Sequence, residues 1–339
     1  MEYITAGGSM QGKTAVIGGG NWGSALAALA AHSSKEVVVY ALEDEVVKSI
    51  NNSHENSVFM KGIQLPENIV AKPFSEIGSI ETDRIIWTVP TQFSGRTAKQ
   101  YAKALKGRRI LIATKGIEID TGDLMIHVLE REFEGSFAVI SGPSFAKEVA
   151  QKMPTAVSIA AKDEEDAKWW QNLLSTSYFR CYYSSDMIGV EVGGAIKNVM
   201  AIATGISDGL GFGHNARAGL ITRGLTEMAR LGMALGGKPE TFMGLSGMGD
   251  LVLTCTGDLS RNRQAGLKIA SGMTLDEVTA STNNVAEGVY TTKAAYLLAK
   301  RLGVDTPIIN EVYEILYNNK KPLDSVTDLM KRPLKSESI

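Results

Sequence analysis

Residues 15–23, AVIGGGNWG, together with the alanine- and leucine-rich segment 24–31 that follows them, decide the fold of this chain. Apolar residues typical of a buried strand lead into a Gly-x-Gly-x-x-Gly turn made by Gly18, Gly20 and Gly23, and a helix-like segment comes directly after it. In such a turn the first glycine permits the tight bend, the second lets the backbone approach a pyrophosphate, and the third lets strand and helix pack closely. The stretch therefore predicts a dinucleotide site at a helix start, where free backbone N–H groups bind anions.

The glycine turn indicates a class of cofactor but not a reaction. The same loop occurs around flavins and methyl donors, and a purely structural turn in a cofactor-free sheet is the alternative. Other parts of the chain must therefore indicate the chemistry.

Composition and charge narrow the class of protein. A chain of 339 residues with 44% hydrophobic and 21% charged residues is typical of a globular protein, and at ~100–200 residues per domain it predicts two domains. The formal net charge of −2 gives no electrostatic case for nucleic acid or an anionic membrane as partner, so we expect a small-molecule substrate. Residues 1–12 lack the pattern of a signal peptide.

Cysteine and histidine usage favours a cytoplasmic protein that holds no metal. Cys181 and Cys255 lie far apart and form no disulfide framework, which fits a reducing compartment. The histidines are scattered and form no metal-ligand spacing with each other or with acidic residues. They are His32, His54, His127 and His214.

Two patterns of secondary structure divide the chain. Short β-branched or aromatic runs alternate with helix-like segments up to about residue 186, which predicts an α/β fold with a Rossmann-like, doubly wound parallel sheet. The expected strands are 14–17, 36–41, 84–89, 109–113, 137–141, 156–160 and 179–184, and the expected helices are 21–31, 92–105, 122–134, 144–150 and 164–174. Beyond this point only helical patterns recur, at 188–206, 215–231, 261–271, 275–280, 291–302 and 308–317. We therefore predict a dinucleotide-binding domain over 13–186 and an all-helical, C-terminal substrate and catalytic domain over 187–332.

Lys197 stands in a predicted helix that is apolar on nearly every face. Burying an ammonium group without a partner is costly, so such a lysine has a lowered pKa or a polar partner, and both suit proton transfer. The alternatives are a side chain that reaches the surface or one that pairs with Glu191.

Other polar residues follow predicted strands or begin predicted helices. Asp250 is a single carboxylate among glycines and apolar residues, and the run 260–263, Ser-Arg-Asn-Arg, offers a guanidinium and amide donors that suit a phosphate. Lys115, and Gly142 with Ser144, come directly after strands, where open α/β sheets bind ligands. Taken singly, each position also fits an ordinary solvated charge or helix start.

Seven motifs taken together resemble the bacterial-type NAD(P)-dependent sn-glycerol-3-phosphate dehydrogenases. The resemblance extends from about residue 14 to 330 and is specific because the motifs occur in combination. The motifs are 18–27 (GGGNWGSALA), 113–118 (ATKGIE), 140–148 (ISGPSFAKE), 193–199 (GGAIKNV), 211–218 (GFGHNARA), 247–255 (GMGDLVLTC) and 260–263 (SRNR).

The resemblance implies reversible hydride transfer between dihydroxyacetone phosphate and sn-glycerol 3-phosphate, with NAD or NADP as cofactor and no metal. It implies a homodimer that supplies glycerol 3-phosphate for phospholipid synthesis. Lys197 matches the family's catalytic lysine, the general base in oxidation and general acid in reduction. The matching substrate residues are Lys115, Gly142, Ser144, Lys197, Asp250, Ser260, Arg261 and Asn262. The matching cofactor residues are Gly18, Gly20, Asn21, Trp22, Gly23, Lys115, Ala146, Arg261, Val285 and Glu287.

One departure leaves the choice between NADH and NADPH open. Many members of the family carry Arg or His, a cation for the 2′-phosphate of NADP, where Leu42 stands at the end of the second predicted strand. The alternatives to this activity are another 3-hydroxyacid or ketopantoate-type dehydrogenase, which lacks the phosphate-fitted Ser260-Arg261-Asn262, and a non-catalytic dinucleotide sensor, which has no need of a buried Lys197.

Overall fold

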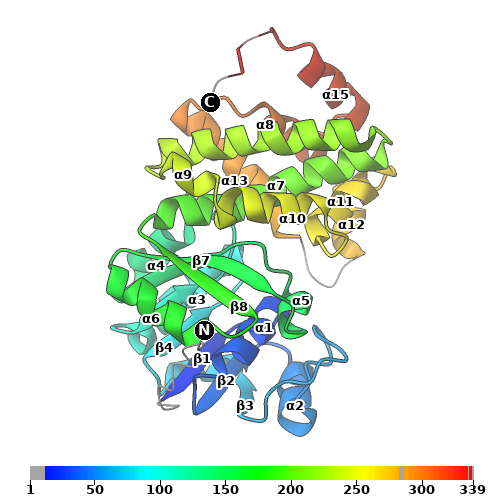
Figure 1. Cartoon of the computed structure of the whole chain (residues 1–339). Coiled ribbons are helices and arrows are strands. Elements are labelled where there is room, and N and C mark those ends of the chain that lie inside the picture. The colour runs from blue at the N-terminus through cyan, green and yellow to red at the C-terminus, as the bar shows by residue number, and fades with distance from the viewer. Residues whose placement is uncertain (1–11, 282–285, 335, 338–339) are drawn as a thin grey trace. The chain divides into compact units, whose positions relative to one another are not determined.

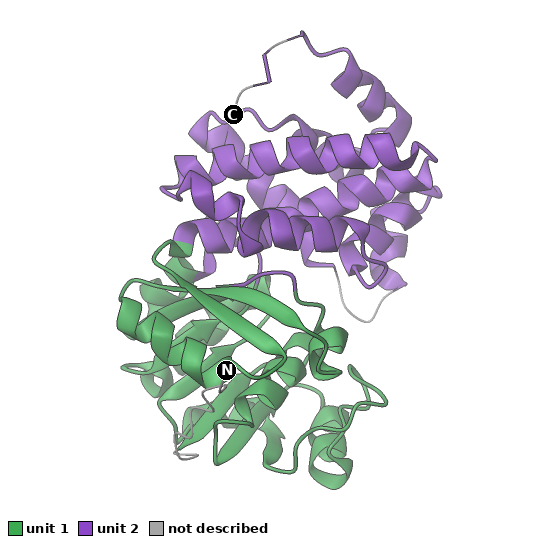
Figure 2. Ribbon diagram, in the orientation of Figure 1, with its two compact units in different colours: residues 1–114, 126–140, 144–187 green, residues 115–125, 141–143, 188–339 purple. Residues whose placement is uncertain are grey.

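The structure is a computed structural model that describes residues 12–281, 286–334 and 336–337. It divides into two compact units, coloured separately in Figure 2. Unit 1 comprises residues 1–114, 126–140 and 144–187, and unit 2 comprises 115–125, 141–143 and 188–339. The domains predicted from the sequence follow chain order, whereas the units do not: two short segments after strands of unit 1 belong by their contacts to the helical unit.

Unit 1 contains an eight-stranded sheet in the order β3-β2-β1-β4-β5-β6-β7-β8 (Figure 1). Its first six positions have the strand order of a doubly wound dinucleotide-binding sheet, so the predicted fold class is confirmed. Strand β1 runs parallel to both β2 and β4, and the pairs β2–β3, β4–β5, β5–β6 and β7–β8 are also parallel. The strands are β1 Lys13–Ile17, β2 Glu36–Ala41, β3 Ile69–Pro73, β4 Arg84–Trp87, β5 Arg109–Ile112, β6 Ser136–Ser141, β7 Thr155–Ala161 and β8 Phe179–Ser184.

The sequence pattern missed β3 and α2, the helix directly before it. Strand β3 is an edge strand, and its segment IVAKP contains a lysine and a proline, residues that weaken a strand signal but are tolerated at an edge. The helical segments of this part of the chain are α1 Asn21–Ala30, α2 Asp44–Ser53, the 3₁₀ helix η1 Phe74–Ser79, α3 Thr91–Leu105, α4 Met125–Glu132, α5 Ala146–Ala150 and α6 Glu164–Leu174.

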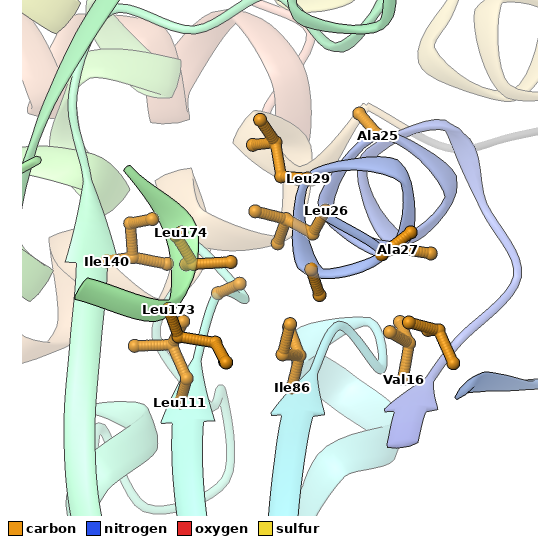
Figure 3. Close-up of a cluster of buried hydrophobic side chains, with 14 of the residues drawn as sticks. Val16, Ala25, Leu26, Ala27, Leu29, Ile86, Leu111, Ile140, Leu173 and Leu174 are labelled. Carbon is orange, nitrogen blue, oxygen red and sulfur yellow. The ribbon is translucent and has the colours of Figure 1, made fainter. Parts of the chain in front are cut away.

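The core of unit 1 lies between the sheet and its helices (Figure 3). Val16 of β1 and Ile86 of β4 face α1, from which Leu26 and Leu29 project, and Leu173 of α6 joins the same cluster. All of these side chains are buried. A parallel sheet covered on both faces needs near-continuous apolar strands, which explains the uninterrupted runs read from the sequence.

Unit 2 is built from helices around α7, Met187–Gly209. Of the described helices, α7 alone is long and apolar enough to cross a membrane. Its most apolar stretch of 18 residues is 89% buried inside the structure, as in the core helix of a globular protein. The remaining helices are α8 Gly213–Ala234, α9 Pro239–Phe242, the π-helical turn η2 Leu245–Gly249, α10 Asp250–Thr256, α11 Arg261–Ala270, α12 Leu275–Ala280, α13 Glu287–Leu302, α14 Pro307–Tyr317 and α15 Pro322–Met330.

Helices α7 and α11 touch backbone to backbone. A Cβ atom added at Gly205 of α7 would lie 2.1 Å from the carbonyl oxygen of Arg263, and one added at Gly266 of α11 would lie 2.2 Å from that of Ile202. Only glycine permits this approach. The crossing holds the helix that carries Lys197 against the helix that begins with Arg261.

Replacing Gly205 with alanine should lower the free energy of unfolding by about 1–3 kcal/mol, because the added methyl group must push the two helices apart. Urea unfolding followed by circular dichroism measures this change.

Gly219→Ala is the matched control. Gly219 also lies inside a helix, α8, but no atom lies within 4 Å of its added Cβ, so alanine there should stabilise the helix by up to about 1 kcal/mol. Equal effects of the two substitutions would contradict the importance of the crossing.

Candidate active site

The glycine turn between β1 and α1 fits a dinucleotide. Gly18 has a φ of 118°, and a Cβ there would lie 2.5 Å from Thr88 Oγ1. A Cβ at Gly23 would lie 2.0 Å from the carbonyl oxygen of Gly18, so strand and helix approach as closely as the sequence predicted. At Gly20 a Cβ would meet nothing within 4 Å, which leaves open space at the helix N-cap, where no side chain caps the backbone N–H groups.

Asn56, a residue that the sequence reasoning missed, braces this turn. Its side chain is fully buried, and its Nδ2 donates to the carbonyl oxygen of Gly19 at 2.7 Å and to Ser24 Oγ at 2.8 Å. Its Oδ1 accepts from the backbone N–H of Phe59 at 3.0 Å. Asn21 reaches the same segment and donates to the carbonyl oxygen of Phe59 at 2.6 Å. The conformation of the turn therefore depends on a loop more than thirty residues away.

The remaining cofactor residues predicted in unit 1 lie against its core. Trp22 of α1 and Ala146 of α5 are partly buried and pack against the apolar cluster. Ser144 lies between β6 and α5, in the same unit. Leu42, where the sequence departs from the family pattern, follows β2 and is 75% exposed.

Unit 2 brings together four residues that the sequence singled out separately. Lys197 Nζ on α7 donates to Asp250 Oδ1 at 2.6 Å, and Lys115 Nζ donates to Asp250 Oδ2 at 2.8 Å. Lys115 Nζ also reaches the carbonyl oxygen of Gly142 at 3.3 Å. The side chain of Lys197 is thus buried and paired with an aspartate, and its alternative partner Glu191 is not needed to explain it.

Two adjacent glycines on α7 make this cluster possible. A Cβ at Gly193 would lie 2.3 Å from the carbonyl oxygen of Ser246, in the π-helical turn η2 directly before Asp250. A Cβ at Gly194 would lie 2.6 Å from Ser141 Oγ and 3.4 Å from the side chain of Lys115. The two glycines precede Lys197 by one turn, so both partner segments can approach the helix beside it.

The electrostatics of the cluster favour one anion between two cations. Burial raises the pKa of Asp250, but the ammonium groups of Lys115 and Lys197 outweigh this effect and hold the pKa below its ordinary value. Burial lowers the pKa of Lys197 to about 8, although Asp250 opposes that shift. A lysine with such a pKa exchanges its proton near neutral pH, as an acid–base group must.

Thr254, which the sequence reasoning also missed, holds the aspartate from one turn further along α10. Its hydroxyl donates to the carbonyl oxygen of Asp250 at 2.6 Å and lies 3.3 Å from Asp250 Oδ1. An (i, i+4) pair of this kind is readable from sequence only after the helix is known to begin at Asp250.

The first turn of α11 carries the residues predicted to bind phosphate. Ser260 is the N-cap, and its hydroxyl accepts from the backbone N–H of Arg263 at 3.2 Å. Asn262 Nδ2 donates to Asn198 Oδ1 at 2.9 Å, and Asn262 Oδ1 accepts from the backbone N–H of Gly288 at 2.9 Å. Asn198 follows Lys197 directly and is a third residue that the sequence reasoning missed. These bonds tie the candidate phosphate residues to α7.

An ion-pair network also holds the first turn of α11. Asp208 at the end of α7 accepts from Arg263 at 2.9 Å and from Arg217 of α8 at 2.8 Å. Arg261 extends from this anchored turn. Burial lowers the pKa of the Arg261 guanidinium, and the carboxylate of Glu287 opposes that shift, so two predicted cofactor residues lie within electrostatic range of each other. Val285, the remaining predicted cofactor residue, lies outside the described residues.

No group of three or more His, Cys, Asp or Glu residues in the described part of the chain could hold a metal ion. The cysteines Cys181 and Cys255 are both buried, and burial raises the pKa of each thiol to about 12. A thiol with so high a pKa is a poor nucleophile.

A doubly wound sheet with an open glycine turn, and a buried lysine held by an aspartate in a helical unit, define a nicotinamide-dinucleotide-dependent dehydrogenase. Residues 13–167 match the N-terminal part, and residues 186–327 the C-terminal part, of the NAD-dependent glycerol-3-phosphate dehydrogenases. The chain belongs to the NAD-dependent glycerol-3-phosphate dehydrogenase family.

Relatives and solved structures agree with this assignment. The glycerol-3-phosphate dehydrogenase [NAD(P)+] of Citrifermentans bemidjiense is 49% identical over 335 residues, which are 97% of this chain and 100% of that protein. The crystal structure of glycerol-3-phosphate dehydrogenase from Coxiella burnetii has a TM-score of 0.91 at 37% identity and covers 96% of this chain and 100% of that one. A ketopantoate reductase from Ralstonia eutropha has a TM-score of 0.57 at 14% identity over 93% of this chain and 99% of that one, and shares the fold alone.

Asn56→Ala should weaken NADH binding about tenfold or more, because two hydrogen bonds that hold the glycine turn are lost. Quenching or enhancement of NADH fluorescence on titration measures the affinity.

Asn68→Ala is a suitable control in the same unit. Asn68 Nδ2 also makes two hydrogen bonds to backbone carbonyl oxygens, of Ala31 and Ser34, but at the far end of α1. If both variants weaken NADH binding equally, Asn56 acts through general stability and not through the turn.

Proposed function

We propose that this protein is an NAD(P)-dependent glycerol-3-phosphate dehydrogenase that interconverts dihydroxyacetone phosphate and sn-glycerol 3-phosphate. The observation that carries the proposal is the pair formed by Lys197 and Asp250, buried in the helical unit of a chain of this family. The names of the relatives, and the fit of the first turn of α11 to a phosphate, support this substrate.

The open turn at Gly20 fits the cofactor, with Gly18 and Gly23 giving the close packing that keeps it open. When bound, the dinucleotide supplies the hydride in reduction and accepts it in oxidation. The backbone N–H groups at the start of α1 would bind the pyrophosphate, because no side chain caps them and no acidic residue stands in the first turn of this helix.

Lys197 performs the proton transfer. In reduction its Nζ gives a proton to the C2 oxygen of dihydroxyacetone phosphate while hydride adds to C2, which leaves a neutral lysine and a hydroxyl group. In oxidation the neutral amine takes that proton back as hydride leaves C2. Lys115 contacts the other carboxylate oxygen of Asp250. The positive charges of Lys197 and Lys115 stabilise the C2 oxygen of the substrate while that atom is partly negative. Asp250 holds the Nζ atoms of both lysines in place throughout.

The substrate's phosphate would bind at Arg261, Asn262 and Ser260. The anchored turn offers a guanidinium group and amide donors, and such charge-assisted bonds suit a dianion. Gly142 and Ser144 are the remaining substrate residues that we propose. We call Ser260, Arg261 and Asn262 the phosphate arm. A ketopantoate-type dehydrogenase would not need the phosphate arm, and a non-catalytic sensor would not need a buried lysine paired with Asp250.

The biological setting follows from the family and the composition. We propose a cytoplasmic homodimer that supplies glycerol 3-phosphate for phospholipid synthesis. The two cysteines, which are unpaired in the structure, and the near-neutral net charge support this setting.

The direct test is the loss of NADH or NADPH absorbance when dihydroxyacetone phosphate is added to the purified protein. We expect turnover with this substrate and little with ketopantoate. Turnover with ketopantoate alone, or with neither compound under either cofactor, would overturn the proposed function.

Lys197→Ala should lower kcat by ~10²–10⁴-fold and leave NADH affinity unchanged, because only the proton transfer is lost. In the wild-type protein the pKa near 8 gives opposite pH profiles for the two directions. Reduction needs the protonated lysine, so its kcat/KM falls as pH rises through about 8, whereas kcat/KM for oxidation rises through the same range. A variant with wild-type turnover, or parallel profiles in both directions, would remove Lys197 from the mechanism.

Arg261→Ala should lower kcat/KM for dihydroxyacetone phosphate by ~10–100-fold, since a lost charged hydrogen bond costs ~1.5–3 kcal/mol. Activity on unphosphorylated dihydroxyacetone should change far less. Lys268→Ala, on the same helix with its Nζ bonded to Ser281 Oγ, should change neither activity. Equal losses on the two substrates would show that Arg261 does not bind the phosphate.

A further inference from the structure

We propose that a cavity within unit 2 binds an amphipathic organic acid, a carboxylate with an aliphatic chain. The cavity has a volume of about 720 Å³ and lies among α7, α8, α14 and α15. This size is within the range of small-molecule sites, ~300–1,000 Å³. None of the residues that line it belongs to the glycine turn, the Lys197–Asp250 cluster or the phosphate arm. The cavity therefore has no part in the proposed reaction.

The walls of the cavity suit an aliphatic chain. Apolar side chains from all four helices line it, among them Ile206 of α7, Leu220 of α8, Ile315 of α14 and Leu329 of α15. Gly219 of α8 also faces it, and a Cβ there would meet nothing within 4 Å. Apolar surface of this extent that is not covered by the protein's own side chains favours an apolar ligand.

Two buried hydroxyl groups in the cavity lining lack a hydrogen-bond partner. Ser207 of α7 and Ser325 of α15 are 4% and 2% exposed, and neither Oγ atom has a partner among the described residues. Buried polar groups in folded proteins are nearly always hydrogen-bonded, and leaving one unpaired costs ~1–3 kcal/mol. Both Oγ atoms are covered by protein atoms in the structure, so a ligand with acceptor oxygens would satisfy them once the two side chains turn toward the cavity.

The charges around the cavity leave one cation uncommitted. Glu311 is paired with Lys320 at 2.6 Å, and Arg332 with Asp305 at 2.8 Å. Within the described parts of the chain, Arg223 of α8 is half-buried, lines the cavity and has no hydrogen-bond or ion-pair partner. One free guanidinium group matches a single carboxylate head group.

Glu227, the remaining acidic group of the lining, opposes an anion only weakly. Its two carboxylate oxygens accept from the backbone N–H groups of Ile308 and Ile309 at 2.7 and 3.1 Å. Burial raises the pKa of Glu227 to about 7, so the group is partly protonated near neutral pH. The free charge of the lining is therefore positive.

The test is calorimetric titration of the full-length protein with decanoate, below the concentration at which it forms micelles, and with 1-decanol as the uncharged ligand of the same chain length. We expect decanoate to bind saturably with one site per chain and at least about tenfold more tightly than decanol. Arg223→Gln should remove this preference by weakening decanoate alone. Failure of decanoate to bind, or equal affinities of the two ligands, would overturn the proposal.

A filling variant locates the site. Gly219 lines the cavity, and an added Cβ there meets nothing within 4 Å, so Gly219→Phe directs a ring into the cavity and should abolish binding of both ligands, whereas Gly219→Ala should retain it. Turnover of dihydroxyacetone phosphate by both variants provides the control for folding. Unchanged decanoate affinity in Gly219→Phe would overturn the proposal.

The competing occupant is a second copy of this chain. Sedimentation velocity of the wild-type protein and of Gly219→Phe distinguishes it: a dimer that dissociates in the filling variant, with no decanoate bound by the wild type, would assign the cavity to subunit contact and overturn the proposal. An unchanged oligomeric state, together with the loss of decanoate binding, supports the ligand site.

Discussion

The contact between Lys197 and Asp250 is the interaction on which the helical unit depends. An ammonium group and a carboxylate are both removed from water, and neither could be buried alone, because an unpaired buried charge costs several kcal/mol. The ion pair also constrains the surrounding packing. Positions 193 and 194 of α7 must be glycine, because η2 and the side chain of Lys115 approach the helix there. The same ion pair therefore constrains both the candidate site and the packing of this unit. The pair is stable because both charges have a partner, and burial at the same time lowers the pKa of the lysine.

In unit 1 the groups that the rest of the structure must hold are backbone N–H groups and not charged side chains. The turn between β1 and α1 leaves its helix start uncapped, which exposes donors that an anion can use. An uncapped turn has little stability of its own, so Thr88 and Asn56 hold it from outside: each donates to backbone carbonyl oxygens of the turn. In both units, then, residues far apart in the chain hold a group that would otherwise be unstable.

The motifs predicted much of the candidate site, because the chemistry limits which residue types can stand there. Lys197, Asp250, Lys115 and Gly142 were identified from motifs, and the structure brings them into one cluster. Asn56, Asn198 and Thr254 were not identified. Each acts by hydrogen bonds to partners that only folding brings near, and a lone asparagine or threonine in a sequence gives no sign of this. Strand β3 was not predicted because its edge position tolerates a lysine and a proline, which weaken the strand pattern in the sequence.

The sequence by itself determined the class of fold and the glycine turn, and it singled out Lys197 as the candidate acid–base lysine. These are set by local properties: strand and helix periodicity, the absence of a Cβ, and the cost of a charge on an apolar helix. Tertiary structure alone decided which carboxylate partners Lys197, that segments 115–125 and 141–143 belong to the helical unit, and that a cavity with two unpaired hydroxyl groups lies among α7, α8, α14 and α15. The physical reason is that ion pairs, close backbone crossings and cavities depend on distances between residues far apart in the chain, and sequence periodicity carries no record of those distances.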